Sequence, residues 1–459
     1  MRYQNQFNHR NSPWIIDGTG APVVNSMFIN YAWNEKRLAD SYAWAKELGL
    51  DPFRTLFPGT ENDKYGYNPP YDTRLIFPEG GAPLAGWGLF GTDFVWNKYK
   101  NKFDPNDQEE VYRRERRYWS GPTEDPTDRV GRTLYEPYPD PFHAVNPEEY
   151  KCWDGVAHYI PERSAIGSYP FVTRFNTGHG KAFFLQGRLA SAKEWNNAGI
   201  QDILPSWQWW IQRFDAKQDP LDENRPVSER PLQPSFDYSI AYDGGSSLKV
   251  SGLLEASVTT ELRLFKTKLP VTNDVNMAIT YKTGMRDVAT NMAVGLIFED
   301  APNHFAWLDV GHSTCNDWNT RTFRLEAFTG RTIAAIGLRF ASSSQSDYTI
   351  HIGELALTNN EQQPSVDPTG FSLDEVYFEA DQAELFLSWD FDTEGVWFYD
   401  LHRVKDNGQR ELIGRTYDDV YYVKSLRRLH EEKTSYLELI AVSFDGAKSG
   451  SAELTLDWP

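Results

Sequence analysis

Cysteine is nearly absent from this 459-residue sequence, which contains only Cys152 and Cys315. These two lie far apart and form no C-x-x-C pair, so the pattern excludes a disulfide framework and the common zinc and redox motifs. Long apolar runs are missing too, since none approaches the roughly 20 residues of a membrane span. The segment MRYQNQFNHRN lacks the apolar core and cleavage site of a signal peptide. The sequence therefore leaves the cellular location open.

Positive charge is scarce relative to negative charge. Lys and Arg total 46 against 65 Asp and Glu, which gives a formal net charge of -19. The longest basic cluster is the short run RRERR, so a nucleic-acid partner is not expected. Aromatic residues are abundant instead, at 15% of the chain with 16 Trp. Because aromatic rings pack against the apolar faces of sugars, this composition favours a carbohydrate ligand.

The first 165 residues alternate short apolar strands with helical stretches. The segments SMFINYAW, FRTLFPGTE and GWGLFGTDFVW each have the composition of a strand. Between the first two, Asn34 suits a helix N-cap, Gly49 suits the C-terminal end, and one helix face carries apolar side chains. These are Leu38, Tyr42, Ala45 and Leu48. A second amphipathic helix is predicted over DQEEVYRRERRYWSG, and the alternation indicates parallel strands covered by helices.

Beyond Phe171 the pattern changes to closely spaced strands that are separated by Gly, Asn, Asp and Ser turns. Segments such as SSLKVSG, TELRLFKTKL, MAVGLIFED and YTIHIGELAL predict an antiparallel β-sandwich. The polar stretch TNNEQQPSVDPTG reads as a linker, and the block after it has the length of an immunoglobulin-type sandwich. The predicted domains are therefore residues 1–168, 169–359 and 366–459.

Several long motifs in unbroken order resemble the endo-β-N-acetylglucosaminidases of glycoside hydrolase family 85. They are YQNQFNHRN, NSMFINYAWNE, GYN, GLFGTDFVW, YRRERRYWSG, WDGVAHYIPERSAIGSYPFVTRFNTGHGKAFFLQG and KEWNNAGIQDILPSWQWW. The resemblance runs from about Arg2 to about Ile240, and more loosely to about Leu357. It implies a (β/α)8 barrel with its active site at the C-terminal ends of the strands, followed by β-sandwich domains.

The family resemblance also implies a reaction, which is hydrolysis of the GlcNAc-GlcNAc bond in the core of N-linked glycans. In that reaction the acetamido oxygen of the substrate attacks the anomeric carbon, an Asn orients the acetamide, and a Glu two residues later acts as general acid and base. The family carries this Asn-x-Glu pair in a stretch like FDG-aromatic-aromatic-x-N-x-E, and a later WYDS-like strand supplies a Tyr. This sequence contains neither stretch. The three predicted strands then correspond to about the sixth, seventh and eighth of the barrel.

The expected fold is therefore the C-terminal portion of a (β/α)8 TIM barrel, about strands 6–8, followed by two antiparallel β-sandwich domains. Three strands cannot close a barrel, so we expect unpaired edges, an exposed apolar face and no catalysis by this chain alone. The expected partners are an N-linked glycan or glycoprotein and the missing N-terminal half of the barrel. Two alternatives stay open, a non-catalytic glycan-binding protein and the second half of a split enzyme.

By position in the family motifs, eight residues are candidates for one wall of the glycan cleft. They are Tyr3, Asn30, Tyr31, Trp33, Glu61, Asp93, Phe94 and Trp96. In this interpretation the rings stack on sugars while the amide and carboxylates bind hydroxyls. In the alternative interpretation Tyr31 and Trp33 pack against the next helix, Asp93 caps a loop and Glu61 is a solvated charge. A replacement acid pair of Glu61 and Asp93 is disfavoured, because nothing would orient the acetamide.

No catalytic residue and no cofactor is expected in this chain. A structural calcium at Asp243 is a possible exception, because SIAYDGGSSLKVSG resembles the early strands of carbohydrate-binding jelly rolls. His179 between glycines is expected to be a turn residue and not a metal ligand, since no second His lies at ligand spacing. The run PSWQWW is expected to pack, although a sugar platform is the alternative.

Overall fold

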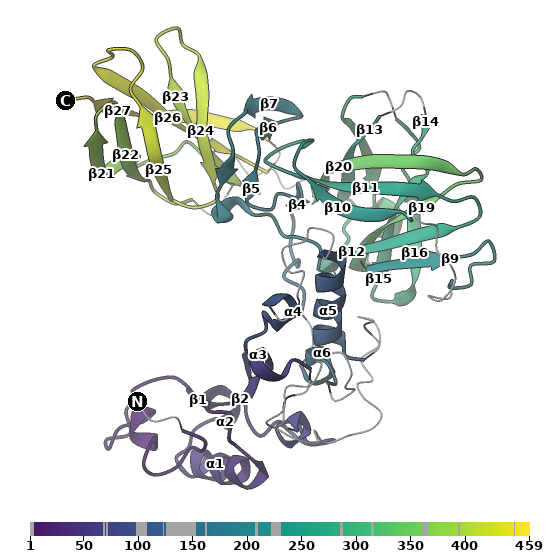
Figure 1. Ribbon diagram of the computed structural model, residues 1–459, viewed down its shortest axis with the longest axis vertical. Helices are drawn as coiled ribbons and strands as arrows, with labels where there is room; N and C mark the ends of the chain where they lie inside the picture. Colours follow the sequence, from purple (N-terminus) through teal and green to yellow (C-terminus); the bar gives the residue numbers. More distant parts are fainter. Residues whose placement is uncertain are drawn as a thin grey trace. The chain divides into compact units, whose positions relative to one another are not determined.

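The computed structural model divides into two compact units, Met1–Arg163 and Ser164–Pro459 (Figure 1). The division lies close to the predicted boundary after residue 168, and both sandwiches belong to the second unit. The structure describes residues 4–67, 69, 72–97, 108–122, 124, 153–160, 163–206, 210–221, 231–284, 288–313, 316–359, 366–392, 395–444 and 446–459. No helix among these residues has the length and apolar character to cross a membrane.

The first unit contains a small parallel sheet in the order β1-β2-β3. Its strands are β1 (Met27–Ile29), β2 (Leu56–Glu61) and β3 (Gly88–Phe90). Met27 of β1 pairs with Leu56, and Gly59 of β2 pairs with Gly88, in both cases in parallel. The prediction of three parallel strands is confirmed.

All three strands are shorter than predicted, and in β2 and β3 a short helix takes up part of the predicted strand. Asp51 accepts a hydrogen bond from the Phe53 amide at 3.1 Å, and Pro52 occupies the first helical position. The segment Pro52–Thr55 is therefore the short helix α2, so the predicted strand starts three residues later, at Leu56. In the same way the predicted strand GWGLFGTDFVW ends at Phe90, and Phe94–Asn97 forms helix α4.

Helix α1 (Glu35–Glu47) covers one face of the sheet, and it begins directly after Asn34 as predicted. The Asn34 side chain accepts a hydrogen bond from the Arg37 amide at 3.0 Å. Leu38 and Ala45 are buried in the core that also contains Met27 and Ile29. Ser41 is buried on this face where Tyr42 had been expected, because its hydroxyl donates to the Arg37 carbonyl and accepts from the Phe7 amide.

A second core of the first unit gathers around helix α5 (Gln108–Ser120). Phe94 of α4 and Tyr118 of α5 are buried there with Trp153, whose ring stacks on Tyr118 at 5.1 Å. Other helical segments of the unit are α3 (Asn62–Tyr65), α6 (Val156–Tyr159) and the 3-10 turns Ser12–Trp14 and Thr73–Leu75.

The first sandwich of the second unit has two antiparallel sheets. One sheet has the path β10 (Gln233–Asp237), β11 (Ser247–Leu254), β20 (Ser346–Thr358), β13 (Asn276–Thr283) and β18 (Asn319–Arg324), with β4 (Phe171–Thr173) beside β20. The other runs β16 (Ala301–Asp309), β15 (Met292–Phe298), β19 (Thr332–Ala341), β12 (Thr259–Pro270) and β9 (Trp210–Phe214). The rings of Phe171 and Phe265 meet at 5.2 Å, so the sheets pack face to face.

Short paired strands and turns connect these sheets. The pairs are β5 (His179–Gly180) with β8 (Trp195–Asn196), β6 (Phe183–Leu185) with β7 (Arg188–Ser191), and β14 (Val288–Ala289) with β17 (His312–Ser313). The 3-10 turns are Ala198–Ile200 and Glu326–Phe328.

The second sandwich packs a three-stranded sheet against a four-stranded sheet. The first has the order β21 (Ser372–Glu379), β22 (Gln382–Ser388) and β25 (Val420–Arg427). The second has the order β24 (Arg410–Thr416), β23 (Phe398–Val404), β26 (Thr434–Val442) and β27 (Lys448–Asp457). Leu385 of β22 and Leu401 of β23 share one buried core, so the sheets face each other. This agrees with the strand number of an immunoglobulin-type sandwich.

Buried ion pairs join the two sandwiches within the second unit. Arg415 of β24 forms ion pairs with Asp400 of β23 and with Asp243 of the first sandwich. Arg174 pairs with Glu354 at 2.7 Å, and its guanidinium lies 4.0 Å from the centre of the Trp397 ring. These contacts explain why both sandwiches form one compact unit.

Candidate functional site

The carboxyl ends of β1, β2 and β3 meet at one edge of the parallel sheet. Asn30 and Tyr31 follow β1, Glu61 ends β2 and Phe90 ends β3. Glu61 and Phe90 are direct register partners, and the Tyr31 ring lies 5.7 Å from the Phe90 ring. In parallel sheets this edge is where functional side chains collect. The edge thus brings Asn30, Tyr31 and Glu61 to neighbouring strand ends.

An aromatic surface covers the sheet face opposite helix α1. Phe28 is 44% exposed and Phe90 is 50% exposed, and Tyr31 contacts both rings. A Cβ atom on Gly59 or Gly88 would lie 2.3 or 2.5 Å from Phe28 ring atoms, so the Phe28 ring lies across both glycines. The two glycines thus leave room on this face for the flat ring of Phe28. Phe28 and Phe90 were not predicted as site residues, although the alternation of Met27, Phe28 and Ile29 gave the signal.

The polar candidates at this edge have local partners. The Asn30 side chain donates to Asn5 Oδ1 at 3.1 Å, and the Asn30 amide donates to the Gln4 carbonyl at 2.7 Å. Glu61 is half-buried at the end of β2. Asp93 is exposed; its carbonyl accepts from the Asn97 amide at 2.9 Å and its carboxylate from the Asn97 side chain. Asp93 thus lies at the start of α4 and not at the end of a strand.

Three predicted wall residues pack in the cores of the first unit. Trp33 is 5% exposed, and its Nε1 donates to the Gly59 carbonyl at 2.8 Å. Phe94 is fully buried, with its ring 4.9 Å from the Tyr67 ring. Trp96 is partly buried against the same core. For Trp33 this agrees with the packing alternative, and Phe94 is likewise covered, whereas Trp96 keeps part of its surface exposed. Tyr3 lies outside the described residues.

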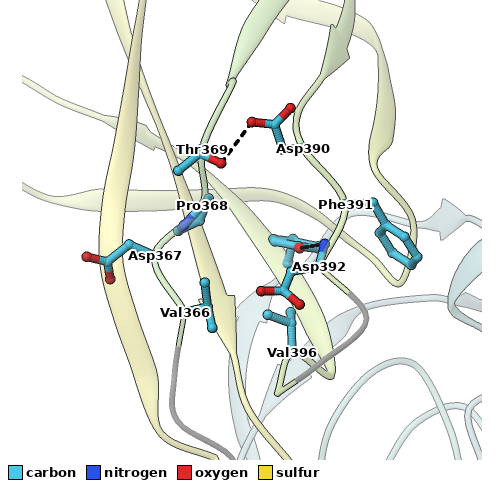
Figure 2. A pocket seen from close by; sticks show the side chains of 9 residues that line it. Val366, Asp367, Pro368, Thr369, Asp390, Phe391, Asp392 and Val396 are labelled. Carbon is cyan, nitrogen blue, oxygen red and sulfur yellow. Dashed lines mark hydrogen bonds between the residues drawn. The ribbon is translucent and has the colours of Figure 1, made fainter.

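A small pocket lies in the loops of the second sandwich, with a volume of about 200 Å³ (Figure 2). Three carboxylates, those of Asp367, Asp390 and Asp392, line it together with Tyr399. Asp367 accepts from the Gly450 amide at 2.6 Å, and Asp390 accepts from the Thr369 hydroxyl at 2.8 Å. The pocket is smaller than the usual 300 to 1,000 Å³ of a ligand site. The carboxylates of Asp367 and Asp390 thus hold loop segments together through these hydrogen bonds.

The remaining sequence candidates have ordinary structural partners. His179 is exposed beside Tyr238, with 4.6 Å between ring centres. Trp210 is buried beneath the Arg263 guanidinium, while Trp207 and Trp209 lie outside the described residues. Asp243 faces the guanidinium of Arg415. The described part of the chain holds no group of three or more His, Cys, Asp or Glu that could bind a metal. The calcium site stays a prediction.

Comparison with known protein families shows to which family the chain belongs. The model of glycosyl hydrolase family 85 matches residues 1–183, and the model of the GH85 endohexosaminidase C-terminal domain matches residues 368–459. The chain belongs to glycoside hydrolase family 85. The two matches place family 85 sequence both in the unit with the parallel sheet and in the second sandwich.

Similar proteins agree with this assignment. Cytosolic endo-β-N-acetylglucosaminidases from Danio rerio and Gallus gallus are 20% and 29% identical over 332 and 109 residues, which are 60% and 23% of this chain. The matched stretches span 43% and 12% of those relatives. The crystal structure of the Endo-D glycoside hydrolase domain from Streptococcus pneumoniae R6 has a TM-score of 0.68 at 24% identity. That match covers all of this chain and 66% of the Endo-D chain, and it shows a shared fold.

Proposed function

We propose that this family 85 chain supplies one wall of the glycan cleft of an endo-β-N-acetylglucosaminidase acting on the chitobiose core of N-linked glycans. The observation that carries the proposal is the open aromatic face of the parallel sheet. Phe28 and Phe90 are about half exposed there, and Tyr31 bridges them at the carboxyl edge. Rings at this edge offer faces to sugar C–H groups, and the Asn30 amide and Glu61 carboxylate offer partners for hydroxyls.

The same face supports an incomplete (β/α)8 barrel. A closed barrel pairs every strand edge and fills its interior with side chains. Here the middle of the face, at Phe28, is open to water, and exposed apolar patches of this kind mark sites that another element covers, whereas Phe90 and Tyr31 lie at the carboxyl edge that faces the sugar. Further strands are needed to close the sheet. They belong either to a longer form of this protein or to a second chain.

In the proposed reaction the substrate acts as its own nucleophile. Its acetamido oxygen attacks the anomeric carbon, and a general acid protonates the departing GlcNAc oxygen. The same residue, now a base, removes a proton from the water that opens the oxazoline ring. The family's stretch that orients the acetamide and supplies this acid has no counterpart in the sequence. The proposed contribution of this chain is therefore sugar positioning, and the chain alone is inactive.

The test measures glycan release from a high-mannose glycoprotein. The purified chain alone should release none, whereas mixing it with a polypeptide that carries the Asn-x-Glu stretch should restore release. In the restored enzyme, Tyr31→Ala should lower kcat/KM at least tenfold. The control Trp14→Ala, which removes a ring that is 51% exposed elsewhere in the unit, should leave kcat/KM unchanged. Enzyme-like release by the chain alone would overturn the proposal.

A further inference from the structure

The three-stranded sheet of the second sandwich presents an aromatic surface to solvent. Tyr377 of β21, Phe386 of β22 and Tyr422 of β25 are 57%, 38% and 47% exposed. Alternation along each strand puts these rings opposite the buried side chains, such as Leu385, which has no exposed area. The strands that carry these exposed rings are therefore fixed in place by the packing of their opposite face in the core. We refer to Tyr377, Phe386 and Tyr422 as the aromatic platform.

The three rings of the platform are neighbours across the strands. Phe386 and Tyr422 are register partners, with ring centres 4.9 Å apart. Tyr377 lies diagonally from Phe386, with ring centres 6.2 Å apart. The rings therefore form one continuous row over three strands, in which the planes of Phe386 and Tyr422 differ by 39° and the Tyr377 ring stands at 82° to the Phe386 ring. Such a row is larger than a single exposed aromatic residue, which would need no explanation.

Carboxylates alternate with the rings on the aromatic platform. Glu375 is the register partner of Phe386, and Glu384 is the partner of Tyr377. The Tyr377 hydroxyl donates to Glu375 Oε2 at 2.7 Å, and the Tyr422 hydroxyl donates to Glu384 Oε2 at 3.1 Å. An ionised carboxylate has about four acceptor positions, so each keeps further positions for a ligand. The platform thus combines apolar ring faces with hydrogen-bond acceptors at fixed positions.

We propose that the aromatic platform binds an uncharged oligosaccharide. A pyranose ring presents C–H groups on its faces and hydroxyl groups at its edge, which matches rings that alternate with acceptors. The two carboxylates disfavour nucleic acids and acidic polysaccharides, since like charges repel across such a surface. The rings lie side by side in a row and do not enclose a cage, which favours a sugar chain over a single cation. This surface does not rest on the function proposed for the parallel sheet.

Affinity electrophoresis of the full chain through gels that contain galactomannan or glycol chitin, both uncharged, tests the proposal. The parent chain should be retarded in at least one gel. Phe386→Thr and Tyr422→Thr remove a ring but keep a good strand former, and each should weaken retardation at least tenfold. The matched control is Tyr436→Thr, which removes a 53% exposed ring from β26 in the other sheet, and it should be retarded like the parent.

Three outcomes would overturn the proposal. The first is no retardation of the parent by either polysaccharide, and the second is retardation that both platform variants retain. The third is retardation by polylysine alone that is lost in the platform variants, which would identify a surface for cationic peptides. A melting curve of each variant that matches the parent establishes that the sandwich is folded. Because no cleavage is measured, the result is independent of the glycan-release assay.

Discussion

The Tyr417 hydroxyl donates a hydrogen bond of 3.0 Å to Asp202 Oδ1, across the joint between the two sandwiches. The other carboxylate oxygen of Asp202 accepts from the Arg174 amide at 2.8 Å and from the Asn176 amide at 3.0 Å. Asp202 is buried, so these donors replace the water that its carboxylate would otherwise bind. Polar contacts thus hold the second sandwich against the first, and they make the stability of the joint sensitive to charge.

Replacing Asp202 by Asn should change how the stability of the second unit depends on pH. Burial raises the pKa of Asp202 above its ordinary value of 3.8, so the folded chain binds this proton more tightly than the unfolded chain does. The stabilisation from this linkage is complete below about pH 3.8 and is lost as pH rises through the raised pKa. The parent should therefore lose stability relative to Asp202→Asn as pH rises above 3.8. Melting curves across this range check the sign, and a constant difference would contradict it.

Replacing Arg415 by Met should destabilise the second unit strongly. The Arg415 side chain is 5% exposed, and its removal leaves the carboxylates of Asp243 and Asp400 buried without their cation. Breaking a buried ion pair in this way costs about 3 to 5 kcal/mol. The control is Arg339→Met in the first sandwich, because its partner Asp309 is 84% exposed and stays solvated when the guanidinium is lost. Equal midpoints of urea unfolding for both variants would show that the buried pairs contribute nothing.

Replacing Trp33 by Ala should destabilise the first unit by about 3 to 5 kcal/mol, because a large buried ring leaves a cavity. The Gly59 carbonyl also loses the hydrogen bond from Trp33 Nε1. As a control, Trp14→Ala removes a ring that is 51% exposed and should change the unfolding midpoint little. If glycan binding falls while the midpoint of Trp33→Ala stays at that of the parent, Trp33 has a role in the cleft wall instead.

Replacing Gly91 by Ala should cost more than the same change at Gly49, although both glycines have a positive φ angle, +68° and +73°. A left-handed conformation alone costs an alanine about 1 to 2 kcal/mol. At Gly49 the new Cβ meets nothing within 4 Å, whereas at Gly91 it would lie 2.2 Å from Asp63 Cβ and 2.7 Å from Asp63 backbone atoms. The chain after β3 must then move. Thermal unfolding of both variants measures the difference, and equal losses would rule out a close contact at Gly91.

Local signals predicted much of the first unit correctly. Asn34 marks the start of α1, and the three apolar segments contain the three parallel strands. The strand limits were less accurate, because the capping of α2 by Asp51 and Pro52 competes with the apolar run FRTLF. The predicted positions of the candidate wall residues were also correct in part. Asn30, Tyr31 and Glu61 lie at strand ends as predicted, but Asp93 begins a helix.

The family and the two kinds of sheet could be predicted from the sequence, because periodicity, turn residues and long motifs are local properties of the chain. Which aromatic rings are covered could not be predicted in this way. Trp33 and Phe94 are buried while Phe28, Phe90 and Phe386 remain exposed, and residue type does not distinguish them. Burial depends on which segments meet across the fold. The joint that links Asp202 and Asp243 to Tyr417 and Arg415 likewise unites residues that lie far apart in sequence.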